Sequence, residues 1–61
     1  MEFTSILVSL PPDGIDLIVL CTLFPGLEII AIFDSANQIF TVVESGLFVP
    51  AYSVIEWKEV I

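Results

Sequence analysis

Few side chains in this sequence can carry out covalent or acid–base chemistry. The chain has one cysteine, Cys21, one lysine, Lys58, and neither arginine nor histidine. A catalytic thiol needs a base or a positive neighbour to form the thiolate, and a serine triad needs a histidine. Cys21 lies within an apolar run, so we interpret it as a core residue. We therefore expect no catalytic residues and no enzyme activity.

The sequence also lacks the side chains that ligate most metals and cofactors. One cysteine and no histidine cannot supply the three or four nitrogen or sulfur ligands of a zinc site. Asp13 and Asp16 are close in sequence, but a calcium loop needs six or more oxygen ligands, and this turn has two carboxylates and two prolines. We interpret Asp13 as a turn residue and Asp16 as an exposed residue at the start of a strand. We expect no metal, no cofactor and no small-molecule substrate.

The acidic side chains offer electrostatic recognition instead. Eight acids against one base give a net charge of −7. This charge repels nucleic acid and anionic membranes, and it steers the chain towards a basic partner. Spread carboxylates can imitate DNA phosphates on a basic protein surface, or they can simply keep an apolar chain soluble. Both interpretations stay open at the level of sequence.

The central elements that must position these acids are two β-strands. Apolar runs at residues 15–23 and 27–33 flank Phe24-Pro25-Gly26-Leu27, which fits a type II turn with proline second and glycine third. The period-2 alternation places every second residue on the same face. One face, which we expect to be the core, holds Leu17, Val19, Cys21 and Leu23 on the first strand and Leu27, Ile29, Ala31 and Phe33 on the second. The other face holds Ile18, Leu20, Ile30 and Ile32, framed by Asp16, Glu28 and Asp34.

Further strands are expected at residues 3–10, 38–43 and 53–59, with a short extended piece at 47–49. Pro, Gly, Asp, Asn and Ser cluster between these segments and predict turns. A helical turn at 52–61 is the alternative for the C-terminal segment, although no segment has a clear 3.6-residue period. We expect a single domain over residues 1–61, all-β, forming a small antiparallel sheet or partly open barrel of four to five strands.

The second apolar face of the central hairpin has no predicted helix to cover it. Apolar residues make up 57% of the chain, and a chain this short buries only roughly 60% of its unfolded surface. Exposed apolar patches of a few hundred Å² commonly mark interfaces. We therefore predict that Ile18, Leu20, Ile30 and Ile32 form an oligomer interface or a partner interface.

The order of the motifs is similar to a known family. Phe3-x-x-Ile6-x-x-x-Leu10-Pro11-x-x-Gly14, then Leu17-Ile18-Val19, Ala31-Ile32-Phe33-Asp34 and Val54-Ile55-Glu56-Trp57, resemble the short, often phage-encoded "domain of unknown function 551" family. The resemblance spans almost the whole chain. Phe3 stands where that family has Trp, and Glu56 stands where it has His. The resemblance implies a compact β fold and a phage or prophage origin, and it confers no activity.

These observations favour a non-enzymatic, acidic protein-binding module of phage type. Its expected action is to inhibit a host defence protein or nucleic-acid-handling protein by occluding a basic surface. The expected compartment is the cytoplasm, where a lone thiol is ordinary, and that of the host cell if the chain is phage-encoded. Two alternatives are a phage accessory protein that only homo-oligomerises and a small membrane-associated peptide. The predicted partner-binding residues are Asp16, Glu28, Asp34, Glu44 and Tyr52.

Overall fold

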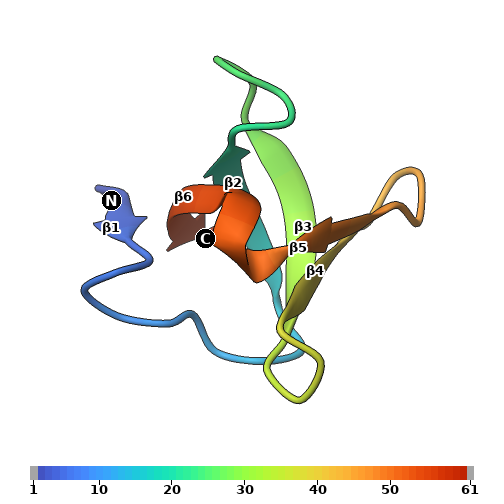
Figure 1. Ribbon diagram of the computed structural model, residues 1–61, viewed down its shortest axis with the longest axis horizontal. Coiled ribbons are helices and arrows are strands. Elements are labelled where there is room, and N and C mark those ends of the chain that lie inside the picture. Colours follow the sequence, from blue (N-terminus) through green and yellow to red (C-terminus); the bar gives the residue numbers. More distant parts are fainter. Residues whose placement is uncertain (1, 61) are drawn as a thin grey trace.

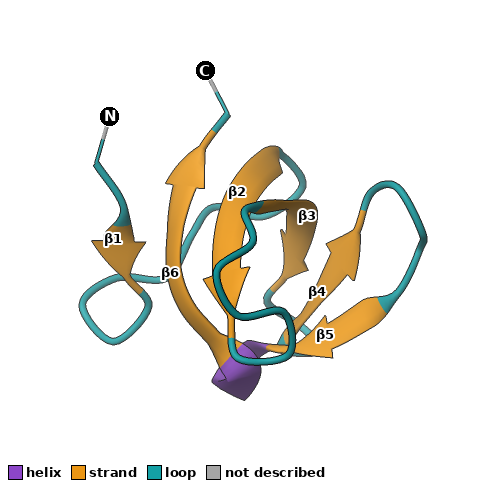
Figure 2. Ribbon diagram, turned by 90° about the horizontal axis from the view of Figure 1, so that it is seen from above, coloured by secondary structure: helices purple, strands orange, loops and turns teal. Residues whose placement is uncertain are grey.

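The computed structural model describes residues 2–60 and confirms the predicted all-β, antiparallel class. Within these residues the elements are β1 (Thr4–Ser5), β2 (Asp16–Cys21), β3 (Ile29–Asp34), β4 (Ile39–Val42), β5 (Phe48–Pro50), the 3₁₀ helix η1 (Ala51–Ser53) and β6 (Val54–Glu59). The six strands form one sheet in the order β1-β6-β2-β3-β4-β5 (Figure 1). The sheet curls around its inner face (Figure 2), which gives nearly equal extents of 25 × 25 × 23 Å.

The central hairpin of β2 and β3 forms as the alternation predicts. Leu17 pairs with Ala31 on the inner face, and Ile18 pairs with Ile30 on the outer face. The predicted type II turn is present in the connecting loop. Gly26 has φ +80°, and the Leu27 N–H donates to the Phe24 carbonyl at 3.2 Å. A positive φ at the third turn position is the conformation for which glycine is selected.

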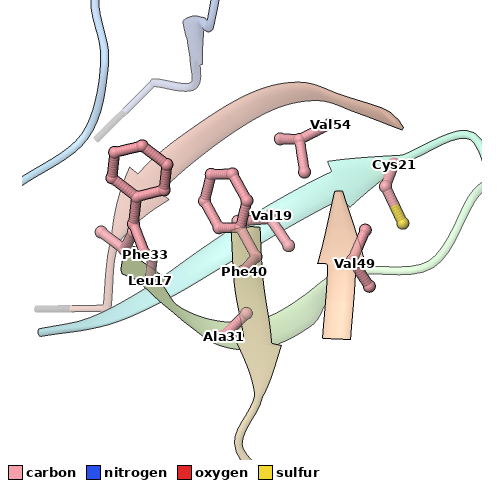
Figure 3. Packing of buried hydrophobic residues seen from close by; sticks show 8 residues of the cluster. All are labelled: Leu17, Val19, Cys21, Ala31, Phe33, Phe40, Val49 and Val54. Atoms are coloured by element: carbon pink, nitrogen blue, oxygen red, sulfur yellow. The ribbon is translucent and has the colours of Figure 1, made fainter. Parts of the chain in front are cut away.

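The core fills the inner face of the curled sheet. The aromatic rings of Phe33 and Phe40 lie with their centroids 4.7 Å apart, and they sit side by side at one end of the buried cluster (Figure 3). The central hairpin contributes the residues predicted to face inward, and β4, β5 and β6 add one residue each. The buried apolar residues are Leu17, Val19, Cys21, Ala31, Phe33, Phe40, Val49 and Val54, and Ile29 packs against them half-buried. Cys21 is thus a buried free thiol, as predicted.

Two residues predicted to face the core are exposed instead. Leu23 and Leu27 lie outside the strands, because β2 ends at Cys21 and β3 begins at Ile29. The register of β2 against β6 shifts between Leu20 and Cys21, and the Thr22 N–H then donates to the Ser53 carbonyl at 2.8 Å. This bond ties the chain beyond Cys21 to η1, so the alternation of β2 does not continue into the loop.

The predicted strand at residues 3–10 is mostly a turn. Thr4 and Ser5 pair with Trp57 and Glu56 of β6, and the Ile6 N–H donates to the Ile55 carbonyl at 3.0 Å. Ser5 ends the strand, because its hydroxyl accepts the Leu7 N–H at 3.2 Å and its carbonyl accepts the Val8 N–H at 3.0 Å. A serine that bonds the backbone two residues ahead competes with the strand ladder. Leu7, Val8 and Leu10 consequently lie on the surface, whereas Ile6 packs against the core.

The C-terminal segment forms β6, so the helical alternative for residues 52–61 is wrong over Val54–Glu59. Tyr52 and Ser53 belong to the 3₁₀ helix η1, and Ile61 lies outside the described residues. Trp57 packs half-buried against the core. Its indole N–H donates to the Ser9 carbonyl at 2.9 Å, which fastens the N-terminal turn to β6. In the part of the chain that the structure describes, no helix is long and apolar enough to cross a membrane.

Candidate functional site

The outer face of the sheet carries apolar side chains bordered by charged ones, because Asp16 lies opposite Ile32, Lys58 opposite Ile18 and Glu56 opposite Leu20. Paired residues on neighbouring antiparallel strands project to the same side. Ile18 lies opposite Ile30, and Ile32 lies opposite Thr41, which in turn lies opposite Phe48. We call this surface the outer face and define it as Ile18, Leu20, Ile30, Ile32 and Phe48.

Part of the outer face is open to solvent. Ile30 is 43% exposed and Phe48 is 64% exposed, whereas Ile18, Leu20 and Ile32 are partly covered. The sequence alone did not place Phe48 on this surface. Phe48 is on this face because it pairs with Thr41, and that pairing follows from the register of β4 and β5 rather than from the local sequence pattern. The four predicted interface residues thus belong to a wider apolar surface.

An acidic groove opens beside Ile30. Its walls are the loop between β2 and β3 and the loop between β4 and β5, both of which project from the sheet in Figure 1. We call it the acidic groove. Its apolar lining is Phe24, Leu27, Ile29, Ile30, Val42, Val43 and Leu47, and its polar lining is Asp16, Glu28, Glu44 and Ser45. Three of the five predicted partner-binding residues therefore line one groove.

The acidic groove has an unbalanced charge. No lysine is among its lining residues, and the single basic side chain of the sequence lies elsewhere. Lys58 is on β6, opposite Ile18, with its Nζ 4.7 Å from the centroid of the Phe3 ring. The carboxylates of Asp16, Glu28 and Glu44 consequently give the groove a net negative potential that favours a cationic ligand group.

Asp34 takes part in a turn rather than in the acidic groove. Its Oδ1 accepts the Ala36 N–H at 3.1 Å, and its Oδ2 accepts the Asn37 side-chain amide at 2.8 Å. The bond from the Asn37 side chain, together with the backbone donors, holds the pKa of Asp34 below its ordinary value of 3.8. Asp13 also bonds locally, since its Oδ2 accepts the hydroxyl of Ser35 at 2.8 Å. These two carboxylates join neighbouring turns.

The lowered pKa of Asp34 predicts an acid-dependent loss of stability. A carboxylate whose pKa is lower in the folded chain than in the unfolded chain stabilises the fold above its unfolded pKa, and the contribution is lost as the pH falls through the folded pKa. We expect Asp34→Ala to lower the melting temperature at pH 7. The difference from wild type should shrink as the pH falls below the ordinary value of 3.8.

Thermal unfolding followed by circular dichroism between pH 7 and pH 2 measures this effect, with the pH range chosen around the ordinary carboxyl pKa. Asp34→Asn is the matched control, because it keeps one acceptor oxygen and removes the titrating group. An Asp34→Ala deficit that stays constant across the whole pH range would show that the charge of Asp34 contributes nothing.

Tyr52, the fifth predicted partner-binding residue, is 90% exposed on η1. It is not among the residues that line the acidic groove. Leu7 and Val8 are the other strongly exposed large side chains, at 94% and 81%, and sequence reasoning missed them because it placed them in a strand. The structure therefore separates the predicted site into the acidic groove, the turn at Asp34 and the exposed ring of Tyr52.

The groove carboxylates do not form a metal site. Within residues 2–60, no group of three or more acidic or cysteine side chains is placed to hold a metal ion. No protein-family model, no curated protein and no solved structure matches this chain.

Proposed function

We propose that this protein is a non-enzymatic binding module that docks the acidic groove and the adjoining outer face onto a basic, partly apolar surface of another protein. One observation carries the proposal: Asp16, Glu28 and Glu44 come from three separate parts of the chain and line one groove together with the exposed Ile30. Binding sites combine an apolar lining with a few polar groups that fix orientation.

The chemistry of the groove favours direct docking over imitation of DNA alone. A phosphate mimic presents charge along a polar surface, whereas these carboxylates border an apolar lining. Burial of apolar area supplies affinity at about 25 cal/mol per Å², while the carboxylates supply orientation and a faster association with a basic partner. The proposed partner surface therefore carries both cationic and apolar side chains.

The biological setting of the proposal comes from the sequence. The resemblance to a short, often phage-encoded family supports a phage origin, and the expected site of action is the cytoplasm of the host. The proposed partner is a host defence protein or a nucleic-acid-handling protein, because such proteins carry basic surfaces. Inhibition would follow from steric occlusion of that surface, without any reaction catalysed by this chain.

Capture from bacterial lysate with a tagged chain, followed by mass spectrometry, tests the proposal. We expect wild type to retain one or more basic proteins, and the triple variant Asp16→Asn, Glu28→Gln and Glu44→Gln to lose them. The matched control is Glu2→Gln, Asp13→Asn and Glu59→Gln, which makes the same change in net charge with the same residue types at positions that do not line the groove. Equal capture by both triple variants would refute the assignment of the groove.

Homo-oligomerisation through the outer face is the second candidate function. The exposure of the apolar side chains of Ile30 and Phe48 on this face favours it, because exposed apolar patches commonly mark interfaces. The charge opposes it, because two copies carry −7 each and the acids Asp16 and Glu28 would approach each other. Sedimentation at low and high salt separates the candidates, since self-association of like-charged copies is strengthened by salt and binding to a basic partner is weakened.

A further inference from the structure

Neither edge of the sheet is suited to adding a strand from a partner. The Val42 N–H donates to the Leu47 carbonyl, and the Ala51 N–H donates to the Gln38 carbonyl. Since backbone groups of successive residues in a strand point to opposite edges, those of Phe48 and Pro50 point to the free edge of β5. Proline has no N–H, so it blunts an edge strand. The opposite edge is β1, which has two residues. Recognition by side chains is therefore favoured over addition of a strand.

The acidic groove limits the shape of what it can accept. Its two walls are loops, the one that contains Phe24 and Leu27 and the one that contains Glu44 and Leu47. The groove encloses about 540 Å³, which is the size of a small-ligand site and admits a few side chains of one segment. The lining combines three carboxylates with aliphatic side chains. Such a lining matches a segment that presents cationic and aliphatic side chains together.

Charge selects among the possible occupants of the groove. A second copy of this chain brings seven net negative charges, and nucleic acid and anionic lipid are also negative. A metal ion does not fit, because the described carboxylates are not grouped to hold one. Lysine or arginine side chains carry both an aliphatic stem for the apolar lining and a positive head for the carboxylates.

We infer that the acidic groove binds one segment of a partner protein that presents lysine or arginine together with aliphatic residues. This inference rests on the proposed function and names the recognition element within it. The positive heads reach Glu28 and Glu44, and the aliphatic side chains lie on Ile30 and Val43. The outer face then supplies additional contact area for a whole partner protein.

Fluorescence anisotropy with a labelled peptide tests the inference. The probe is a peptide of about seven residues that alternates lysine and leucine and spans roughly 23 Å when extended. One comparison peptide alternates lysine and serine, and another alternates glutamate and leucine. We expect the lysine–leucine peptide to bind, the lysine–serine peptide to bind more weakly, and the glutamate–leucine peptide not to bind.

Two charge variants locate the binding site. Glu28→Gln with Glu44→Gln should weaken the lysine–leucine peptide by about tenfold, the loss expected for two partly exposed ion pairs. Glu2→Gln with Glu59→Gln changes the net charge equally away from the groove and should weaken binding less than about twofold. Equal weakening by the two variants, or stronger binding of the lysine–serine peptide, would overturn the inference.

The result is distinguishable from a failure of the proposed function. If the lysine–leucine peptide does not bind, but the groove triple variant still loses a protein captured by wild type, the single-segment inference is wrong and the proposed docking surface stands. If the peptide does not bind and capture is also unchanged, both are wrong.

Discussion

Replacing Phe40 with alanine is expected to remove most of the stability of this fold. Phe40 is fully buried on the inner face, with its ring against Phe33. Truncating a buried phenylalanine costs about 3–5 kcal/mol. A chain of 61 residues is stable by roughly 3–9 kcal/mol at 0.05–0.15 kcal/mol per residue. The variant should therefore be partly or largely unfolded at 25 °C.

Urea denaturation followed by the fluorescence of the single tryptophan measures this loss. Trp57 packs against the core, so its emission reports on the folded state. The matched control is Phe48→Ala, the same truncation on the neighbouring strand, where the side chain is mainly exposed. We expect the control to lose less than about 1 kcal/mol. Similar losses for the two variants would contradict the inner and outer assignment of the faces.

The inner face could be predicted because alternation in the central hairpin is a local property. Leu17, Val19 and Cys21 follow a period of two within one strand, and Ala31 and Phe33 follow it in the next. A Pro-Gly turn between the two runs fixed their antiparallel arrangement. Local pattern and turn chemistry agreed here, which is the condition under which sequence reasoning is dependable.

The lengths of the strands could not be predicted from composition. Leu7 and Val8 have strand propensity, but the hydroxyl and carbonyl of Ser5 bond the turn that contains them. Leu23 continues the apolar run of β2, but the bond from Thr22 to Ser53 diverts the chain. Ser53 lies far along the sequence, so this interaction has no local signature. Tertiary hydrogen bonds here override propensity.

The acidic groove could be predicted only in part. The acids Asp16 and Glu28 were identified because they frame the apolar alternation of the hairpin. Their association with Glu44 depends on the pairing of β3 with β4, which brings Val43 to Ile30 through a bond of 3.0 Å. Asp34 satisfied the same sequence criterion, but its oxygens are taken by Ala36 and Asn37. Sequence position showed which acids are near the hairpin, and hydrogen bonding decides which of them remain available.

Substituting Ile30 with lysine is expected to abolish partner binding while leaving the fold intact. Ile30 belongs both to the outer face and to the acidic groove. The change removes apolar contact and places a positive charge where the proposed basic partner docks, and together these effects should cost about 2–4 kcal/mol, or roughly 30-fold to 1,000-fold in affinity. Because the side chain is already 43% exposed, a lysine can extend into water without burying its charge.

The matched control for this variant is Ile55→Lys. Ile55 is the same residue type, 52% exposed, and lies on β6 away from the groove lining. Its substitution changes the net charge identically, so long-range electrostatics affects both variants alike. Titration calorimetry with the captured partner should therefore show a large loss for Ile30→Lys and less than about a threefold loss for Ile55→Lys. Equal losses would place the docking surface elsewhere on the molecule.

The same pair of variants also decides between partner binding and self-association. If the outer face joins two copies, Ile30→Lys places an unpaired charge inside the interface, and wild-type dimers should become monomers on size exclusion. If the outer face serves a basic partner, wild type and both variants should elute alike, because the like charges of two copies keep them apart. Ile30 is the residue at which the two functions make opposite predictions, since it alone lies both on the apolar outer face and in the lining of the acidic groove.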